Sequence, residues 1–190
     1  MLRAFLKDER GQATIDFVVT LLPLMVVVLT VIEVAIAFFV SETSQKAAQL
    51  AARFAAVRSP VHVSVPAENT LNPTNGEAGD ACFDDDGDHA CVDPGGPFVC
   101  DGAALDPNCD SVAFLELLGE AQRLYPRLEQ EELAVTYAYR NLGAAGGPFI
   151  PEITITIAER PLPINFLSMI GLIQLNAVSA TAYGEDLSST

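Results

Sequence analysis

The sequence predicts an α+β protein. A long N-terminal transmembrane helix continues into an amphipathic helix, and a small extracytoplasmic head follows, with one helix, an antiparallel sheet of about three or four strands and a disulfide-tied loop. Three observations predict this class. Apolar residues, half of the 190-residue chain, are concentrated near the N-terminus. Within residues 111–190, one segment with helical periodicity is followed by segments with strand periodicity. Four cysteines recur in the Gly- and Pro-rich stretch between these two parts.

The N-terminal part contains a segment long and apolar enough to cross a membrane. Residues 17–40 read FVVTLLPLMVVVLTVIEVAIAFFV and contain a single charge, Glu33. As a helix this segment would extend about 36 Å, more than the roughly 30 Å of a hydrocarbon core. A cleaved secretory signal normally has a shorter apolar region, of about 7 to 15 residues. We therefore expect a transmembrane helix that stays in the protein.

The helix is expected to continue beyond the apolar segment. Residues 41–58, SETSQKAAQLAARFAAVR, place apolar and polar side chains on opposite helix faces. The apolar face holds Ala47, Leu50, Ala51, Phe54 and Val57, and the polar face holds Glu42, Lys46, Gln49 and Arg53. Because Ser59-Pro60 disfavours helical backbone, we expect one helix from about Ala13 to Arg58.

Two residues within the apolar segment have alternative interpretations. Pro23 removes a backbone donor, which indicates a simple kink or a functional hinge. Glu33 is costly in lipid, so it either faces a partner group or reaches the interface near Val40.

Residues 60–109 read as loop because they are rich in Gly, Pro, Asn and Asp, and only Val61 to Val65 alternate as a short strand does. Cys82, Cys91, Cys100 and Cys109 recur every nine residues without a CxxC pair, which argues against a zinc or redox site. Two disulfides in an oxidising compartment are the favoured interpretation, with three possible connectivities, and free thiols are the alternative.

Acidic residues cluster in the same loop. Asp84, Asp86, Asp88 and Asp93 could gather a Ca²⁺ ion through oxygen ligands, although the spacing fits an EF-hand loop only in part. A solvated acidic tip is the alternative.

The C-terminal part is expected to form one helix followed by three strands. Ser111 to Tyr125 should form an amphipathic helix with Asp110 or Ser111 as N-cap. Its apolar face holds Phe114, Leu117, Leu118, Ala121 and Leu124. Strands are expected at Leu133 to Tyr139, Ile153 to Ala158 and Leu172 to Tyr183, paired as an antiparallel meander. The uncharged run 162–173 is expected to be core or subunit interface, with lipid contact as the alternative.

Charge and composition exclude several functions. The formal net charge is -15, and residues 59–122 contain 13 acids and no Lys or Arg, so nucleic-acid binding is not expected. No nucleophile–base pair or phosphate-binding loop is present, and His62 and His89 are expected to be surface residues. We expect a protein that is not an enzyme.

The N-terminal region resembles a known family. KDERGQATIDF, residues 7–17, has a charged leader, a Gly, and an acid followed by an aromatic after four residues. This is similar to the prepilin-peptidase site of type IV pilin-like proteins, especially the TadE-like minor pseudopilins of the tight-adherence (Flp) pilus. VIEVAIAFF and QKAAQLAARFAA resemble later parts of their helix, and LIQLNAVSATAYGED resembles their closing strand.

The resemblance implies cleavage between Gly11 and Gln12, and assembly through Asp16, Phe17 and Glu33. Asp16 takes the fifth position of the mature chain, where the family usually has Glu. The parts would then be a leader (1–11), the N-terminal helix (12–58), an acidic Cys-containing loop region (59–110) and an α+β head (111–190).

The expected partners are the prepilin peptidase, other pilin or pseudopilin subunits and the inner membrane. The positively charged residues flanking the helix are nearly balanced, but the short N-terminal tail and the cysteines favour a cytoplasmic N-terminus and a periplasmic head, or a head in an extracellular filament after assembly. The alternative function is a permanently anchored binding module whose acidic loop captures a cation or a partner.

Overall fold

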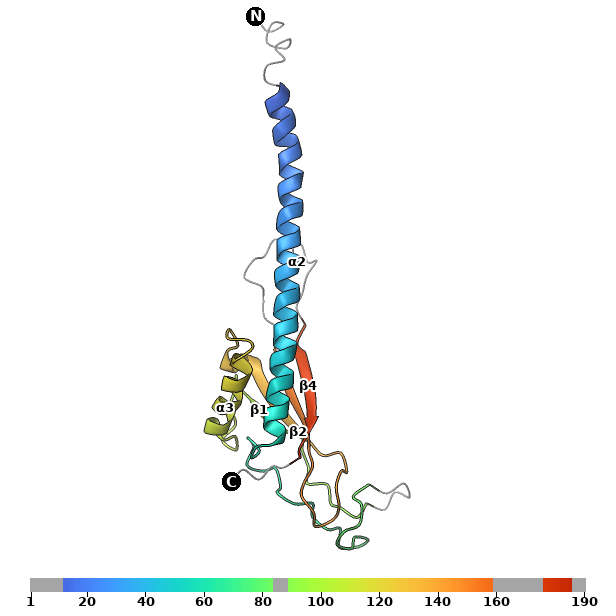
Figure 1. Cartoon of the computed structure of the whole chain (residues 1–190). Coiled ribbons are helices and arrows are strands. Elements are labelled where there is room, and N and C mark those ends of the chain that lie inside the picture. Colours follow the sequence, from blue (N-terminus) through green and yellow to red (C-terminus); the bar gives the residue numbers. More distant parts are fainter. Residues whose placement is uncertain (1–11, 84–88, 159–175, 186–190) are drawn as a thin grey trace, which may run out of the picture. The chain divides into compact units, whose positions relative to one another are not determined.

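The computed structural model describes residues 12–83, 89–158 and 176–185 (Figure 1). The chain divides into two compact units, which we describe separately. The N-terminal unit comprises Met1–Val40 and Pro161–Gln174, and the head unit comprises Ser41–Arg160 and Leu175–Thr190. The predicted run 162–173 lies outside the described residues.

Helix α2 begins at Gln12 and ends at Ala56. The sequence predicted these bounds to within two residues, because the apolar segment and the amphipathic segment have no helix-terminating residues between them. Pro23 lies inside the helix, and helical backbone continues on both sides of it.

The head unit is built on a four-stranded antiparallel sheet in the order β1-β2-β3-β4. The strands are β1 (Phe98–Asp101), β2 (Leu133–Ala138), β3 (Glu152–Ile157) and β4 (Val178–Tyr183). Val135 pairs with Cys100 on one side and with Ile155 on the other, and Ile155 pairs with Ala180. The predicted α+β class and meander are therefore confirmed.

Alternation along the strands divides the sheet into an apolar and a polar face, since successive side chains point in opposite directions. The buried members of the apolar face are Cys100, Leu133, Val135, Tyr137, Ile153, Ile155 and Ile157. Threonines occupy much of the opposite face, including Thr136, Thr154 and Thr156. Within the head unit, α3 and the C-terminal part of α2 lie over this sheet (Figure 1).

The part of α2 in the head unit presents alanines to the core. Ala47, Ala48, Ala51 and Ala52 are fully buried, and Ala55 and Ala56 are nearly so. Leu50 and Phe54 are partly buried, whereas Val57 is 52% exposed, so the predicted apolar face is wrong at Val57. Small side chains allow the helix backbone to approach its neighbours closely, which displaces the larger side chains to the margin of the contact.

We predict that Ala51→Leu destabilises the head unit by roughly 1 to 3 kcal/mol, because three added carbon atoms have no free volume in this contact. Gln45→Leu is the matched control, since Gln45 is exposed on the same helix. Near-UV circular dichroism of the detergent-solubilised chain during urea denaturation measures both, because the chain has tyrosines and no Trp. Equal midpoints for the two variants would contradict the close contact.

Helix α3 (Ser111–Gln122) is capped by Asp110, whose carboxylate accepts hydrogen bonds from the backbone N–H groups of Val112 and Ala113. Phe114, Leu117, Leu118 and Ala121 are buried as predicted. Leu124 is 44% exposed, because the helix ends at Gln122 before another turn can return it to the core. The short 3₁₀ helix η2 (Gln130–Glu132) leads into β2.

The loop region was predicted incompletely. Val61 to Val65 do not form a strand; only His62 makes an isolated bridge, to Cys109. Conversely, β1 lies in the stretch expected to be loop. His62 is buried: its Nδ1 accepts a hydrogen bond from the Ser64 backbone N–H, and its ring centroid lies 5.3 Å from that of Phe98. His89 is exposed as expected.

The four cysteines form two disulfides, Cys82–Cys91 and Cys100–Cys109. Each bridge therefore joins neighbours in sequence, one of the three connectivities that the sequence allowed. Cys100 lies in β1 and Cys109 directly precedes the N-cap of α3, so the second bridge connects the sheet to the start of that helix. Closing a loop of this length contributes about 2 to 3 kcal/mol to stability in the chain-entropy model.

Tyr137 connects the sheet to the segment that follows α2. Its hydroxyl oxygen accepts a hydrogen bond from the Val61 backbone N–H at 3.0 Å, and both residues are buried. Burial raises the pKa of Tyr137 from 10.0 to about 12, because the phenolate would lose its hydration.

We predict that Tyr137→Phe lowers the free energy of unfolding by about 1 to 2 kcal/mol at neutral pH, because the buried Val61 N–H loses its acceptor. This difference should shrink between about pH 10 and 12. There the unfolded wild type releases the Tyr137 proton while the folded protein retains it, so only the wild type loses this stability. Urea denaturation at pH 8, 10 and 11 measures the difference, and a constant value would contradict the raised pKa.

Candidate functional site

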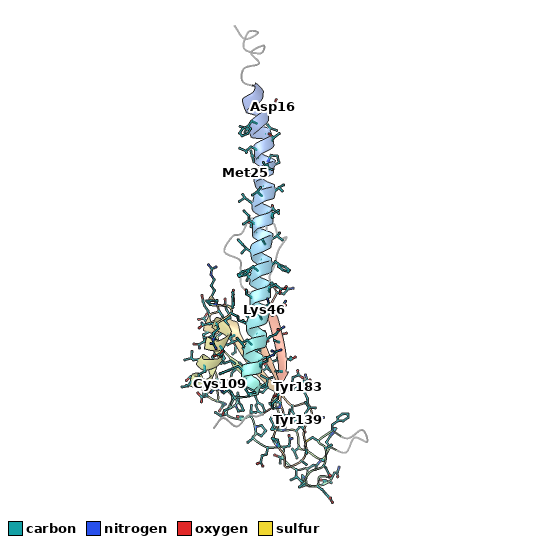
Figure 2. The ribbon with its side chains drawn as sticks, in the orientation of Figure 1. Asp16, Met25, Lys46, Cys109, Tyr139 and Tyr183 are labelled. Atoms are coloured by element: carbon teal, nitrogen blue, oxygen red, sulfur yellow. A yellow bond between two sulfur atoms is a disulfide. The ribbon has the colours of Figure 1, made fainter. Side chains whose placement is uncertain are left out.

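The N-terminal unit presents an unusually apolar surface. Along residues 15–40 of α2, large apolar side chains point outward on most sides of the helix, as Figure 2 shows. Phe38 and Phe39 are each 68% exposed, and Ile15 is 64% exposed. Within the described residues, α2 is the one helix whose length and composition suit a membrane span, with a mean hydropathy of 2.7 in its most apolar window. An apolar environment, either lipid or other helices, would remove this surface from water.

The hydroxyl groups in this part of α2 are satisfied within the helix itself. Thr20 Oγ1 donates to the backbone oxygens of Asp16 and Phe17, at 2.8 and 3.0 Å, and Thr30 Oγ1 donates to the Val26 oxygen at 2.8 Å. Such bonds keep polar atoms paired where water is absent. The hydroxyl groups of Thr20 and Thr30 can therefore lie in lipid while remaining paired.

Two acidic residues of α2 differ in their surroundings. Asp16 is exposed, one residue before the exposed Phe17 (62%). Glu33 is only 5% exposed, and Ala37, one turn later on the same face, is 7% exposed. A carboxylate buried to this extent lies against protein atoms. The two interpretations of Glu33, a partner group or the membrane interface, both stay predictions.

The N-terminal helix is also the part of the chain that matches a known protein family. A sequence profile described as TadE-like protein matches residues 11–53. Residues 11–53 are thus a TadE-like segment. The segment begins one residue before α2 and ends three residues before its last residue, so it coincides with the helix. No curated protein and no solved structure matches the chain.

The TadE-like segment contains all the residues predicted for processing and assembly. Gly11 lies outside the described residues, and Gln12 is the first residue of α2. Asp16 and Phe17 follow within two turns, whereas Glu33 lies about 25 Å further along the helix axis. These residues therefore occupy two separate positions, one at the start of the helix and one at its middle, and not a single cluster.

Three of the four residues predicted to bind calcium, Asp84, Asp86 and Asp88, lie outside the described residues. The fourth predicted ligand, Asp93, closes a turn, since its Oδ1 accepts a hydrogen bond from the Gly95 backbone N–H at 2.8 Å. Among the residues that the structure describes, no three His, Cys, Asp or Glu side chains are grouped to hold a metal. Calorimetric titration with Ca²⁺ remains the measurement for this prediction.

Sequence reasoning missed the full alanine face that follows the apolar segment. Ala48 and Ala52 were not assigned to the buried side, yet both are fully buried. Pairs of small residues four apart in KAAQLAARFAA were the available signal, because small residues mark close helix contacts.

Proposed function

We propose that the chain is a minor pseudopilin that takes part in assembly or initiation of a tight-adherence, type IV-like pilus. In this proposal a prepilin peptidase removes residues 1–11, and the remaining helix stays in the inner membrane until it packs beside the helices of other subunits. The role is structural and not enzymatic. The observation that supports it most strongly is the TadE-like α2 itself, whose residues 15–40 keep large apolar side chains outward.

The proposed cleavage would change the charges at the start of α2. Cleavage before Gln12 would place a new positive amine at the first residue of α2, four residues before Asp16. Asp16 is exposed and thus accessible to an opposite charge on a neighbouring helix. In lipid, two charges neutralise each other far more effectively than in water, so such a pair would fix the stagger between adjacent helices.

Two features support a periplasmic head with a cytoplasmic N-terminus. Both disulfides lie in the head unit, and disulfides persist in oxidising compartments. Arg3, Lys7 and Arg10, which precede α2, suit the cytoplasmic side, where the peptidase would act, although basic residues also follow the apolar segment.

Intact mass of the protein purified from membranes tests the proposal. We expect the mature chain to lack residues 1–11, and we expect Gly11→Ala to abolish this loss. Gly119→Ala is the matched control, because Gly119 is exposed on α3 and an added Cβ there meets no atom within 4 Å. A mature chain that retains residues 1–11 would overturn the proposal and favour a permanently anchored binding module. Loss of the whole segment through residue 40 would exclude both.

A further inference from the structure

We propose that the edge of β4 with which no described residue pairs, together with Lys46 and Arg53 of α2 beside it, binds an extended acidic segment of another protein by β-strand addition. The site lies within the head unit and goes beyond the packing role proposed for the N-terminal helix.

The two edges of the sheet differ in their protection. Strand β1 has four residues, and the Cys100–Cys109 bridge holds a loop against it: Cys109 Sγ lies 3.8 Å from the Val99 carbonyl oxygen. Strand β4, VSATAY, has six residues and pairs with β3 along its whole length. Of the described residues, none pairs with the other edge of β4. Every second residue of β4 therefore directs its backbone N–H and C=O away from the sheet.

The sequence of β4 lacks the usual devices that prevent strand addition. Natural edge strands are blocked by charged side chains, prolines, bulges or short length. VSATAY contains no charge, no Pro and no Gly, and its register with β3 is unbroken from Val178 to Tyr183. The strand is thus suited to accept a further strand through backbone hydrogen bonds, the mode in which many domains bind extended peptides.

A groove runs between this edge and α2. It has a volume of about 480 Å³ and is lined by Gln49 and Arg53 of α2 and by Ser179, Ala180 and Thr181 of β4. Figure 1 shows β4 beside the C-terminal part of α2. Lys46 lies one turn before Gln49 on the same helix face, at the end of β4 opposite to Tyr183 (Figure 2). One wall of the groove is therefore β4, and the other carries Arg53, with Lys46 one turn from Gln49 outside the lining residues.

Among the described residues, Lys46 and Arg53 have no ion-pair partner, unlike three arginines of the head unit. Arg58, Arg123 and Arg140 of the head unit form ion pairs with Glu116, Glu120 and Glu152. The Arg140 guanidinium holds the pKa of Glu152 below its ordinary value through a 2.7 Å hydrogen bond. No acidic side chain within the described residues forms an ion pair with Lys46 or Arg53. In a chain with 25 acidic residues, two exposed cations without such partners at one edge mark a local site for an anionic segment.

A second copy of this chain is a poorer occupant than a different protein. The described acidic stretches of the chain are held in turns: Glu77 N–H donates to Asp80 Oδ2, and the two disulfides close the loops around them. Such segments cannot extend along β4 without unfolding. Two chains of net charge -15 also repel each other. The expected partner is therefore a different protein with a free, extended segment whose side chains alternate between acidic and apolar.

Fluorescence anisotropy with the full detergent-solubilised chain tests the proposal. The probe is a fluorescein-labelled eight-residue peptide of alternating valine and glutamate. Its controls are the same peptide with lysine for glutamate, and one with a central proline that removes a backbone N–H. We expect the acidic peptide to bind at least tenfold more tightly than either control, and to protect β4 amides from hydrogen exchange. The net charge of the protein alone would favour the lysine peptide, so this order distinguishes the site from general electrostatics.

Charge reversal completes the test. Lys46→Glu with Arg53→Glu should weaken binding of the acidic peptide at least tenfold, and both positions are exposed, so the fold should be retained. Arg123→Glu, which changes the exposed C-cap residue of α3 away from the groove, should alter the affinity less than twofold. The proposal is overturned by no binding at 1 mM peptide, by equal binding of the three peptides, or by protection away from β4. Self-association of the chain through β4 would also overturn the proposal, because the edge would then bind a second copy of this chain.

Discussion

Gly102→Ala is expected to destabilise the head unit by roughly 3 kcal/mol or more, because the added Cβ would overlap backbone atoms. A Cβ at this position would lie 1.8 Å from the Gln130 carbonyl oxygen and 2.7 Å from its carbonyl carbon. Gly102 also donates its N–H to the Leu133 oxygen at 2.9 Å, which joins the end of β1 to the start of β2. Neither backbone can move without breaking the pairing of these two strands.

Gly119→Ala is the matched control, because the same substitution at this position is expected to raise stability. Gly119 is exposed within α3, and an added methyl group meets no atom within 4 Å. Ala is favoured over Gly in helices, so this variant should gain about 0.5 to 1 kcal/mol. Urea denaturation followed by near-UV circular dichroism measures both. If Gly102→Ala were as stable as the wild type, the close approach of β1 to the segment before β2 would be wrong.

Periodicity was sufficient to predict the elements that bury one face. The long apolar segment predicted α2. The spacing of apolar residues predicted the buried side of α3, with Phe114, Leu117 and Leu118, and alternating isoleucines predicted β3. The TadE-like segment was recognisable because its signal is local, a Gly and an acid at a set distance before an apolar helix. Such features depend on near neighbours in sequence.

Features that depend on distant contacts could not be predicted in this way. Strand β1 is short and preceded by Gly and Pro, and it is a strand because β2 lies beside it and Cys109 is bonded to Cys100. The alanine face of α2 is buried by elements much later in the sequence, so a preference for bulky apolar residues selected Val57 in error. Asn69 likewise gives no sequence signal, because its partners lie more than 70 residues away.

Asn69→Asp is expected to cost about 3 to 5 kcal/mol at pH 7, although the two side chains have nearly the same shape. Asn69 is 3% exposed, and its Nδ2 donates to the backbone oxygens of Leu142, Ala144 and Pro148 at 3.2, 3.3 and 3.1 Å. An ionised carboxylate would direct a buried negative charge at three carbonyl oxygens. The turn at residues 142–148, which also pairs with residue 69 through backbone bonds to Gly146 and Gly147, would lose its anchor.

The pH dependence of this variant identifies the cause. In the folded variant, burial and the three carbonyl oxygens would raise the pKa of the introduced Asp above its ordinary value of about 3.9. The protonated form can donate to one carbonyl, so the deficit relative to wild type should be smallest near pH 3.5 and should grow as pH rises towards 7. A deficit that does not change with pH would show that lost shape, and not buried charge, destabilises the variant.

Asn72→Asp is the matched control for the same substitution. Asn72 Nδ2 donates to the His89 oxygen at 2.9 Å and its Oδ1 accepts from the Thr74 N–H, but this side chain is solvent-accessible. The variant keeps the acceptor and its charge is hydrated, so its cost should stay within about 1 kcal/mol at any pH. Urea denaturation between pH 3.5 and 7 compares the two variants. A loss at Asn72 as large as that at Asn69 would contradict the anchoring role assigned to Asn69, because burial is the property in which the two sites differ most.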